Sequence, residues 1–172
     1  MIDVNNPGNP ERTTQKRIIK LFTNELNYKY LGNKTESENS NIEEELLSTY
    51  LTNAGYSENY TSRILDILKK ETDNPHRSLY ETNKAVYNLL RYGVDIKTEA
   101  SKVTDKILLI NWAYPEKNNF AIAEEVTLLG NHERRPDLVI YINGIAIGVI
   151  ELKNSRVSIG NGIRQLISNQ KK

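Results

Sequence analysis

The stretch RRPDLVIYINGIAIGVIELK, residues 134–153, decides the fold of this chain. Its two apolar runs, Leu138–Ile142 and Ile145–Ile150, are joined by Asn143-Gly144, a dipeptide typical of two-residue β-hairpin turns. Both faces of each run are apolar, as in strands that are buried on two sides. The stretch therefore predicts a hairpin in the centre of a sheet that helices cover.

Charged residues stand at the open end of this hairpin, with Asp137 on one strand and Glu151 and Lys153 on the other. Such groups are costly at the margin of a buried sheet unless something binds them. Mg²⁺ prefers oxygen ligands and usually takes one or two carboxylates together with water and substrate phosphate. Asp137 and Glu151 would hold that ion, while Lys153 would orient the attacking water or offset charge on the phosphate. The chemistry predicted is hydrolysis of a phosphodiester.

Strand register makes this hypothesis testable. A two-residue turn sets Asp137 opposite Ile150, and a shift of one residue moves a side chain to the other face of a sheet. We therefore expect a three-residue loop or a β-bulge, so that Asp137 faces Glu151.

The charge pattern by itself has little specificity. Asp73 followed by Asp95-Ile96-Lys97 has a similar form without an apolar hairpin, and we interpret it as surface charge. In the alternative interpretation of the hairpin, Asp137 only caps the turn that Pro136 stiffens, and the two later charges are solvated.

Composition excludes several kinds of site. The 172 residues carry 23 basic and 22 acidic side chains, so the net charge of +1 indicates no global attraction to nucleic acid. The absence of cysteine excludes disulfides and thiolate metal sites, and two histidines do not suffice for a histidine-rich one. We expect a cytoplasmic protein, because no apolar run approaches a membrane span or a signal peptide.

Outward from the hairpin, apolar spacing and breakers predict helices first and strands later. The expected helices begin at Pro10, at a capping box of Ser40 and Glu43, after Ser57, and at Leu79, the last ending at Gly93. The expected strands before the hairpin are Val94–Thr98, Ile107–Trp112 and Phe120–Leu129, and a last helix is expected over Ser158–Asn169.

This order predicts an α/β or α+β fold with a core sheet flanked by helices. We expect an N-terminal helical region, residues 1–93, packed on a core of residues 94–172, together forming one compact domain. The apolar stripes of the helices are interpreted as core.

The hairpin motif resembles the nuclease motif of the restriction (R) subunit of type I restriction–modification enzymes. In that family Arg-Pro-Asp, an apolar Asn-Gly hairpin and Glu-Leu-Lys form the PD-(D/E)xK site. The upstream stretches NYKYLGN (27–33), NIEEELL (41–47) and NFAIAEEVTLLG (119–130) are similar to the same family. The resemblance implies a restriction-endonuclease-like core and a Mg²⁺-dependent endonuclease for double-stranded DNA, with Mn²⁺ as a possible substitute.

The resemblance also implies roles for residues. Asp137 and Glu151 would be metal ligands, and Lys153 would assist the catalytic base. A Gln-x-x-x-Tyr pattern often follows the site in this family; Gln165 matches it and is a candidate catalytic residue, whereas Asn169 replaces the tyrosine.

Further candidates surround the motif. Related folds often add an acidic residue from an earlier helix, for which Glu44 or Glu45 is a candidate, although a solvated helix face explains both. Basic residues near the motif in sequence are candidates for DNA contacts, namely Arg134, Arg135, Arg156 and Arg164.

R subunits of this family continue into an ATP-driven motor, and this chain has no phosphate-binding loop for ATP. We therefore expect an N-terminal fragment that acts with the rest of the R subunit, the methyltransferase and the specificity subunits. One alternative is a docking module that joins the motor to those subunits. Another is a PD-(D/E)xK nuclease acting on a different nucleic acid.

Overall fold

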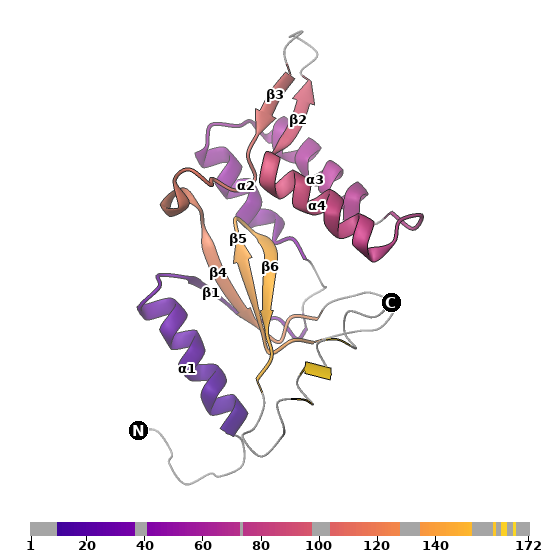
Figure 1. Cartoon of the computed structure of the whole chain (residues 1–172). Coiled ribbons are helices and arrows are strands. Elements are labelled where there is room, and N and C mark those ends of the chain that lie inside the picture. Colours follow the sequence, from indigo (N-terminus) through magenta and orange to yellow (C-terminus); the bar gives the residue numbers. More distant parts are fainter. Residues whose placement is uncertain are drawn as a thin grey trace. The chain divides into compact units, whose positions relative to one another are not determined.

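The computed structural model of the chain describes residues 10–36, 41–72, 74–97, 104–127 and 135–152, together with residues 160, 163, 164 and 167. Within these ranges helices and strands follow one another in the order shown in Figure 1. The helices are α1 (Pro10–Asn24), α2 (Glu44–Asn53), α3 (Glu58–Thr72), α4 (Leu79–Tyr92) and the short 3₁₀ helix η1 (Pro115–Lys117). The strands are β1 (Lys29–Asn33), β2 (Val94–Lys97), β3 (Thr104–Ile107), β4 (Phe120–Glu124), β5 (Leu138–Ile142) and β6 (Ile145–Ile150). The predicted α+β class is confirmed.

The chain forms two compact units. Unit 1 contains α1, β1, β4 and most of the β5–β6 hairpin, and unit 2 contains residues 42–119 and 142–145. The predicted boundary at residue 93 lies inside unit 2. Compact units are not by themselves folding domains, so the division into 1–93 and 94–172 stays a prediction.

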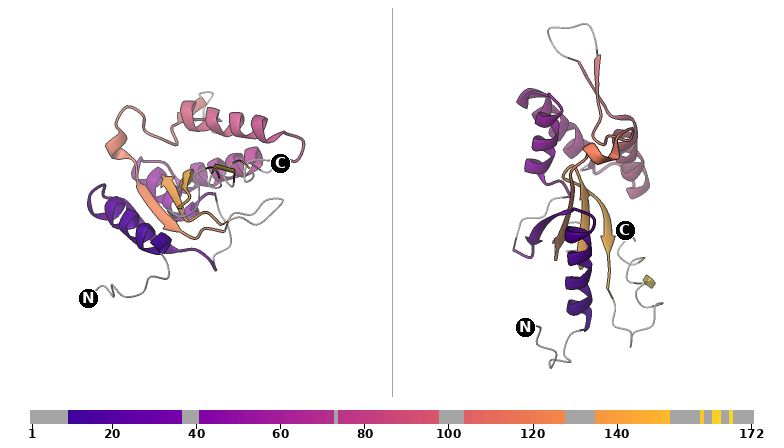
Figure 2. Two further views of the ribbon diagram at one scale, coloured as in Figure 1. Left: turned by 60° about the horizontal axis from the view of Figure 1, so that its bottom comes forward. Right: turned by 90° about the vertical axis from the view of Figure 1, so that its left-hand side faces the viewer.

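Unit 1 is built on a mixed four-stranded sheet of order β1-β4-β5-β6, with β1 parallel to β4. Strands β4 and β5 run antiparallel, because backbone hydrogen bonds join Asn143 to Asn119 at one end and Glu125 to Asp137 at the other. Helix α1 packs beside this sheet, as the two views in Figure 2 show. Aromatic contacts of Tyr28 with Phe22 and with Phe120 connect the end of α1 to β4. Strand β1 was not predicted from the sequence.

The β5–β6 hairpin is confirmed, but its predicted central position is wrong for β6. Among the described strands β6 is the outer one in the sheet order, and Ile147 and Val149 are 47% and 48% exposed. The turn is a two-residue one: Asn143 and Gly144 both have positive φ, 50° and 82°, as a type I′ turn requires. A Cβ on Gly144 would also lie 2.5 Å from the carbonyl oxygen of Glu43. Glycine is therefore required there for two independent reasons.

Unit 2 has its own apolar core, which joins one face of each of α2 and α3 to β2 and β3. Its fully buried side chains include Leu47, Leu51, Ile64, Leu68, Ile96, Ile107 and Leu109. The predicted stripes of α2 and α3 are thus confirmed as core. Helix α4 begins with a capping box of Ser78 and Glu81, and it ends at Tyr92 before Gly93, as predicted.

Several predicted boundaries are wrong. Helix α2 begins after Glu43, whose side chain makes no capping hydrogen bond, so the helix does not start at a Ser40–Glu43 capping box. The strand expected over Ile107–Trp112 ends at Ile107, and the one expected over Phe120–Leu129 ends at Glu124. Most of the predicted helix Ser158–Asn169 lies outside the described residues.

The described helices include none that is both long enough and apolar enough to span a membrane.

Candidate functional site

Acidic residues at three strand ends lie at one end of the unit 1 sheet. Glu124 is the last residue of β4, Asp137 directly precedes β5, and Glu151 directly follows β6. Because β4 and β6 both run antiparallel to β5, the ends of the first two strands lie beside the start of the third. All three side chains are half-buried.

Asp137 is fixed to the backbone that follows β6. Its Oδ2 atom accepts a hydrogen bond of 2.5 Å from the backbone N–H of Leu152, the residue between Glu151 and Lys153. Asp137 itself lies in a bend after the buried Pro136 rather than in β5. The structure therefore brings the carboxylate of Asp137 to the backbone N–H of the residue that follows Glu151.

Of the two expected arrangements, the three-residue loop is wrong, since the turn has two residues, and the β-bulge stays a prediction. Side chains alternate between the two faces of a sheet only within a paired strand. Asp137 and Glu151 both lie outside their strands, so the alternation of faces does not fix their directions. That the two carboxylates face each other stays a prediction.

Helix α1 is tied to this end of the sheet by Gln15, which is 7% exposed. The Nε2 group of Gln15 donates to Oε2 of Glu124, at 3.2 Å, and to the backbone oxygen of Asp137, at 3.1 Å. A single amide therefore joins the end of β4 to the start of β5. No local pattern in the sequence predicts this contact, because the residues involved are more than 100 positions apart.

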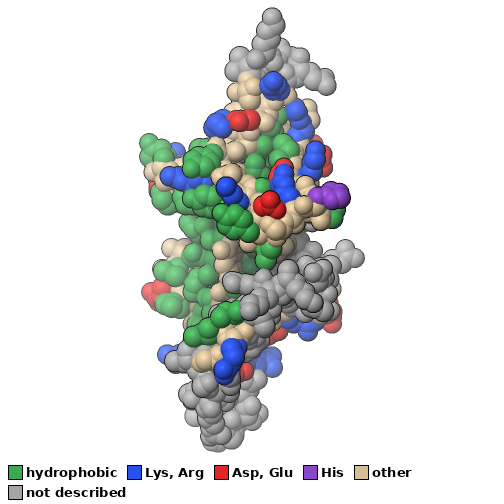
Figure 3. Space-filling view, turned by 45° about the vertical axis from the view of Figure 1, so that its right-hand side comes forward, with side chains coloured by type: hydrophobic (Ala, Val, Ile, Leu, Met, Phe, Trp, Pro, Cys, Tyr) green, Lys and Arg blue, Asp and Glu red, His purple; other side chains and the backbone are tan. Residues whose placement is uncertain are grey.

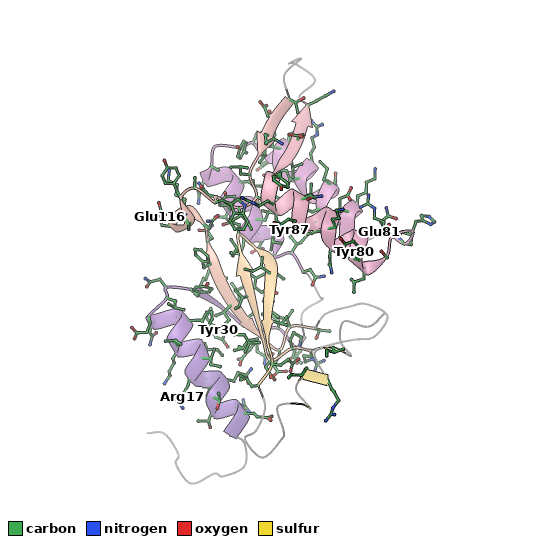
Figure 4. The ribbon with its side chains drawn as sticks, in the orientation of Figure 1. Arg17, Tyr30, Tyr80, Glu81, Tyr87 and Glu116 are labelled. Atoms are coloured by element: carbon green, nitrogen blue, oxygen red, sulfur yellow. The ribbon has the colours of Figure 1, made fainter. Side chains whose placement is uncertain are left out.

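The second oxygen of Glu124 has a partner from β1. The hydroxyl of Tyr30 donates to Oε1 of Glu124 at 2.5 Å. Desolvation raises the pKa of Tyr30 to about 12, with further contributions from the hydrogen bond and the negative charge of Glu124. Figure 4 shows Tyr30 between α1 and the sheet. Glu124 is thus held by an amide and a phenol rather than by a cation among the described contacts.

A pocket of about 340 Å³ opens at this place in unit 1. Glu11 of α1 and three acidic residues at or beside strand ends line it together with polar and basic residues: Glu11, Arg12, Gln15, Asn33, Thr35, Glu124, Glu125 and Asp137. The acidic helix residue that shares a pocket with Asp137 is therefore Glu11. The candidates Glu44 and Glu45 lie on α2 in unit 2, where Glu44 forms an ion pair of 2.6 Å with Lys69.

The remaining predicted residues divide into two groups. Arg135 and Arg164 are described and exposed. The others, Lys153, Gln165, Arg134 and Arg156, lie outside the described residues.

The donor set at the hairpin fits a hard divalent cation. Among the described residues no three Asp, Glu, His or Cys side chains come together as a ready metal site. Mg²⁺ does not require three, since it is commonly bound through one or two carboxylates and retains waters. Asp137 accepts the backbone N–H of Leu152 through Oδ2, and the pairing of Asp137 with Glu151 as metal ligands stays a prediction. In the predicted site, Lys153 accompanies these two ligands.

The competing Asp-x-Lys pattern has the structure expected of surface charge. Asp95 forms an ion pair of 2.7 Å with Lys106, and both side chains are more than half exposed, at 60% and 55%. Asp95 is therefore a suitable control residue for tests of the hairpin site.

Comparisons with known proteins place the chain in a family. The family model described as type I restriction enzyme R protein N terminus matches residues 8–172. The putative type I restriction enzyme MjaIXP endonuclease subunit of Methanocaldococcus jannaschii is 34% identical over 90 residues, 49% of this chain and 8% of that protein. The putative MjaVIIIP endonuclease subunit of the same organism is 39% identical over 57 residues, 33% of this chain and 6% of that protein. Each alignment thus spans less than a tenth of the relative's length.

Proposed function

The chain belongs to the family of type I restriction enzyme R protein N-terminal regions, and from this premise we propose that it carries a Mg²⁺-dependent endonuclease site for double-stranded DNA. Asp137 and Glu151 bind the metal ion, for which Mn²⁺ can substitute. Lys153 orients the attacking water or offsets charge on the phosphate, and Gln165 assists from the following segment. ATP acts only through a motor elsewhere in the R subunit, and the methyltransferase and specificity subunits select the DNA.

One observation carries this proposal: the hydrogen bond of the Asp137 carboxylate to the N–H of Leu152. It sets the first acidic residue of the motif beside the backbone of the Glu-x-Lys segment. A bound divalent cation there would supply charge stabilisation to the reacting phosphate and lower the pKa of a bound water. Both relatives named above are described as endonuclease subunits.

The hydrogen bond also supports the simpler interpretation, in which Asp137 only closes the hairpin. The substitution Asp137→Asn separates the two, because an amide oxygen still accepts from Leu152 but carries no charge for a metal. The matched control is Asp95→Asn, which removes a charge from the exposed Asp-x-Lys pattern. Mn²⁺ binding to the purified chain is measured by titration calorimetry, and folding by circular dichroism.

We expect Asp137→Asn to lose Mn²⁺ binding at least tenfold while its unfolding midpoint stays near that of the parent, and Asp95→Asn to change neither. If Asp137→Asn binds Mn²⁺ as the parent does, the residue is a structural cap and the metal-site proposal fails. Parallel cleavage assays of the assembled enzyme with duplex DNA, single-stranded DNA and RNA test the substrate.

A second candidate function, docking within the restriction–modification assembly, is favoured by exposed aromatic side chains on α4. Tyr80 and Tyr87 are 73% and 58% exposed, and their spacing of seven residues places them on one face of the helix. Exposed aromatic residues are frequent at protein interfaces. The double substitution Tyr80→Ser with Tyr87→Ser should weaken capture of the methyltransferase and specificity subunits without affecting Mn²⁺ binding. Unchanged capture would remove this candidate.

A further inference from the structure

Helix α1 concentrates positive charge in a chain that is otherwise nearly balanced. It holds four of the 23 basic residues and one of the 22 acidic residues, so its net charge is +3 and that of the remainder is −2. All four basic side chains, Arg12, Lys16, Arg17 and Lys20, are exposed. Elsewhere charges of both signs are mixed, as Figure 3 shows around the histidine.

Helix stability does not explain this charge. Arg12, Lys16 and Lys20 follow one another at intervals of four residues, and like charges at that spacing destabilise a helix by roughly 0.2–0.5 kcal/mol per pair. A cation in the first turn is also unfavourable with respect to the helix dipole. No acidic residue lies three or four positions from Lys16, Arg17 or Lys20. The ion pairs found among the described residues do not include these three side chains.

The basic residues form an arc that starts at the candidate site. At about 100° per residue, Arg12, Lys16, Lys20 and Arg17 lie about 60°, 100°, 140° and 200° around the helix from Gln15. Gln15 is buried against Glu124 and Asp137, and Arg12 lines the same pocket as Asp137. Arg17 points away from the sheet in Figure 4. The arc therefore leads from the edge of the pocket to the outer face of α1.

The dimensions of the arc suit the backbone of a nucleic acid duplex. Arg12 and Lys20 are about 12 Å apart along the helix axis, at 1.5 Å per residue. One strand of B-form DNA places a phosphate about every 3.4 Å along its axis, so three or four phosphates span that length. Flexible lysine and arginine side chains bind such phosphates without reading sequence.

We propose that α1 is a binding surface for the phosphate backbone of double-stranded DNA, formed by Arg12, Lys16, Arg17 and Lys20, which guides one strand past the carboxylate pocket. This inference deepens the proposed nuclease function and rests on it for the identity of the ligand. It adds a DNA contact that is distant in sequence from the arginines around the motif. Because Gln15 ties α1 to Asp137, the bound backbone would lie close to the proposed metal ligands.

The test is DNA binding by the purified chain as a function of salt, without divalent cations, using the fluorescence anisotropy of a labelled 20-base-pair duplex. The variant Lys16→Gln with Lys20→Gln removes two charges from α1. The matched control, Lys70→Gln with Lys84→Gln, removes two exposed lysines from α3 and α4. Each phosphate contact contributes about 0.9 to the slope of log K against log salt concentration, so the α1 variant should lose about 1.8 of slope and the control none.

An equal slope in the parent and the α1 variant, or an equal loss in the control, would overturn the proposal. So would a loss seen only with duplex RNA of the same sequence. The Asp137→Asn variant distinguishes failure of the DNA surface from failure of the metal site. It should retain the parent slope of log K against log salt concentration and lose Mn²⁺ binding. If it retains Mn²⁺ while the α1 variant loses DNA, the metal site fails and the DNA surface stands. If Asp137→Asn loses Mn²⁺ binding while the α1 variant binds DNA normally, the DNA surface fails and the metal site stands.

Discussion

Replacing Gln15 with leucine tests whether the contact between α1 and the sheet stabilises unit 1. The side chain is 7% exposed, and its amide donates to the Glu124 carboxylate and to the backbone oxygen of Asp137. Leucine has a similar size and a high helix propensity, so Gln15→Leu removes the two hydrogen bonds with little change in packing or in α1 itself.

The expected loss of stability depends on the hydrogen bonds that each acceptor retains in the variant. The oxygen of Asp137 still accepts from the N–H of Glu125 at 3.2 Å, and Glu124 still accepts from Tyr30. A hydrogen bond to a neutral group contributes about 1 kcal/mol and one to a charged group about 1.5–3 kcal/mol, less where water reaches the carboxylate. Burial of the leucine offsets part of the loss. We expect the free energy of unfolding to fall by about 2 kcal/mol, which lowers Tm by roughly 4–8 °C in a chain of this size.

The assay is urea unfolding followed by circular dichroism, with Asn83→Leu as control because it replaces an exposed amide on α4. A double-mutant cycle of Gln15→Leu with Glu124→Gln isolates the contact, and we expect a coupling free energy of about 1 kcal/mol. A loss below about 0.5 kcal/mol, or a coupling of zero within error, would refute the reasoning.

Three further outcomes are expected. In the assembled enzyme, Lys153→Ala should abolish DNA cleavage while the chain still binds Mn²⁺, and cleavage at the parent rate would exclude its catalytic role. Tyr30 should ionise near pH 12 in an absorbance titration, and this transition should be absent from Tyr30→Phe. Because the ordinary pKa of tyrosine is 10.0, the stability that the Tyr30 hydroxyl contributes persists below pH 10 and is lost between pH 10 and 12. Asn143→Ala should lower the free energy of unfolding by roughly 3–5 kcal/mol, measured in urea. The buried oxygens of Leu109 and Asn118 lose the hydrogen bonds from the Asn143 amide, and alanine must adopt the positive φ of this turn position.

The sequence by itself determined the local structure wherever a strong signal had no competitor. Asn143-Gly144 predicted a turn that requires positive φ at both residues, and both have it. The spacing in α3 and the glycine after α4 predicted those helices well, because apolar periodicity and a stop signal coincide there. The Asp and Glu-x-Lys residues were also found as a candidate site by sequence alone.

Tertiary structure decided the contacts that no local pattern encodes. β1 is a strand because it pairs in parallel with β4, some 90 residues later, and no pattern in its own sequence predicted it. The residue Asn143, predicted only as a turn former, is fully buried and bonds to Leu109 and Asn118.

The candidate site likewise combines residues that the sequence predicted with a contact that only the tertiary structure provides. The residue types of the motif predicted metal chemistry, because carboxylates at a buried margin need a partner. Only the folded chain brought α1 to that margin, through the amide of Gln15 between Glu124 and Asp137. A helix can present the same spacing of glutamine and basic residues in any solvated position. Which face of α1 meets the sheet is fixed by side chains more than 100 residues away, and this is why the sequence alone did not reveal it.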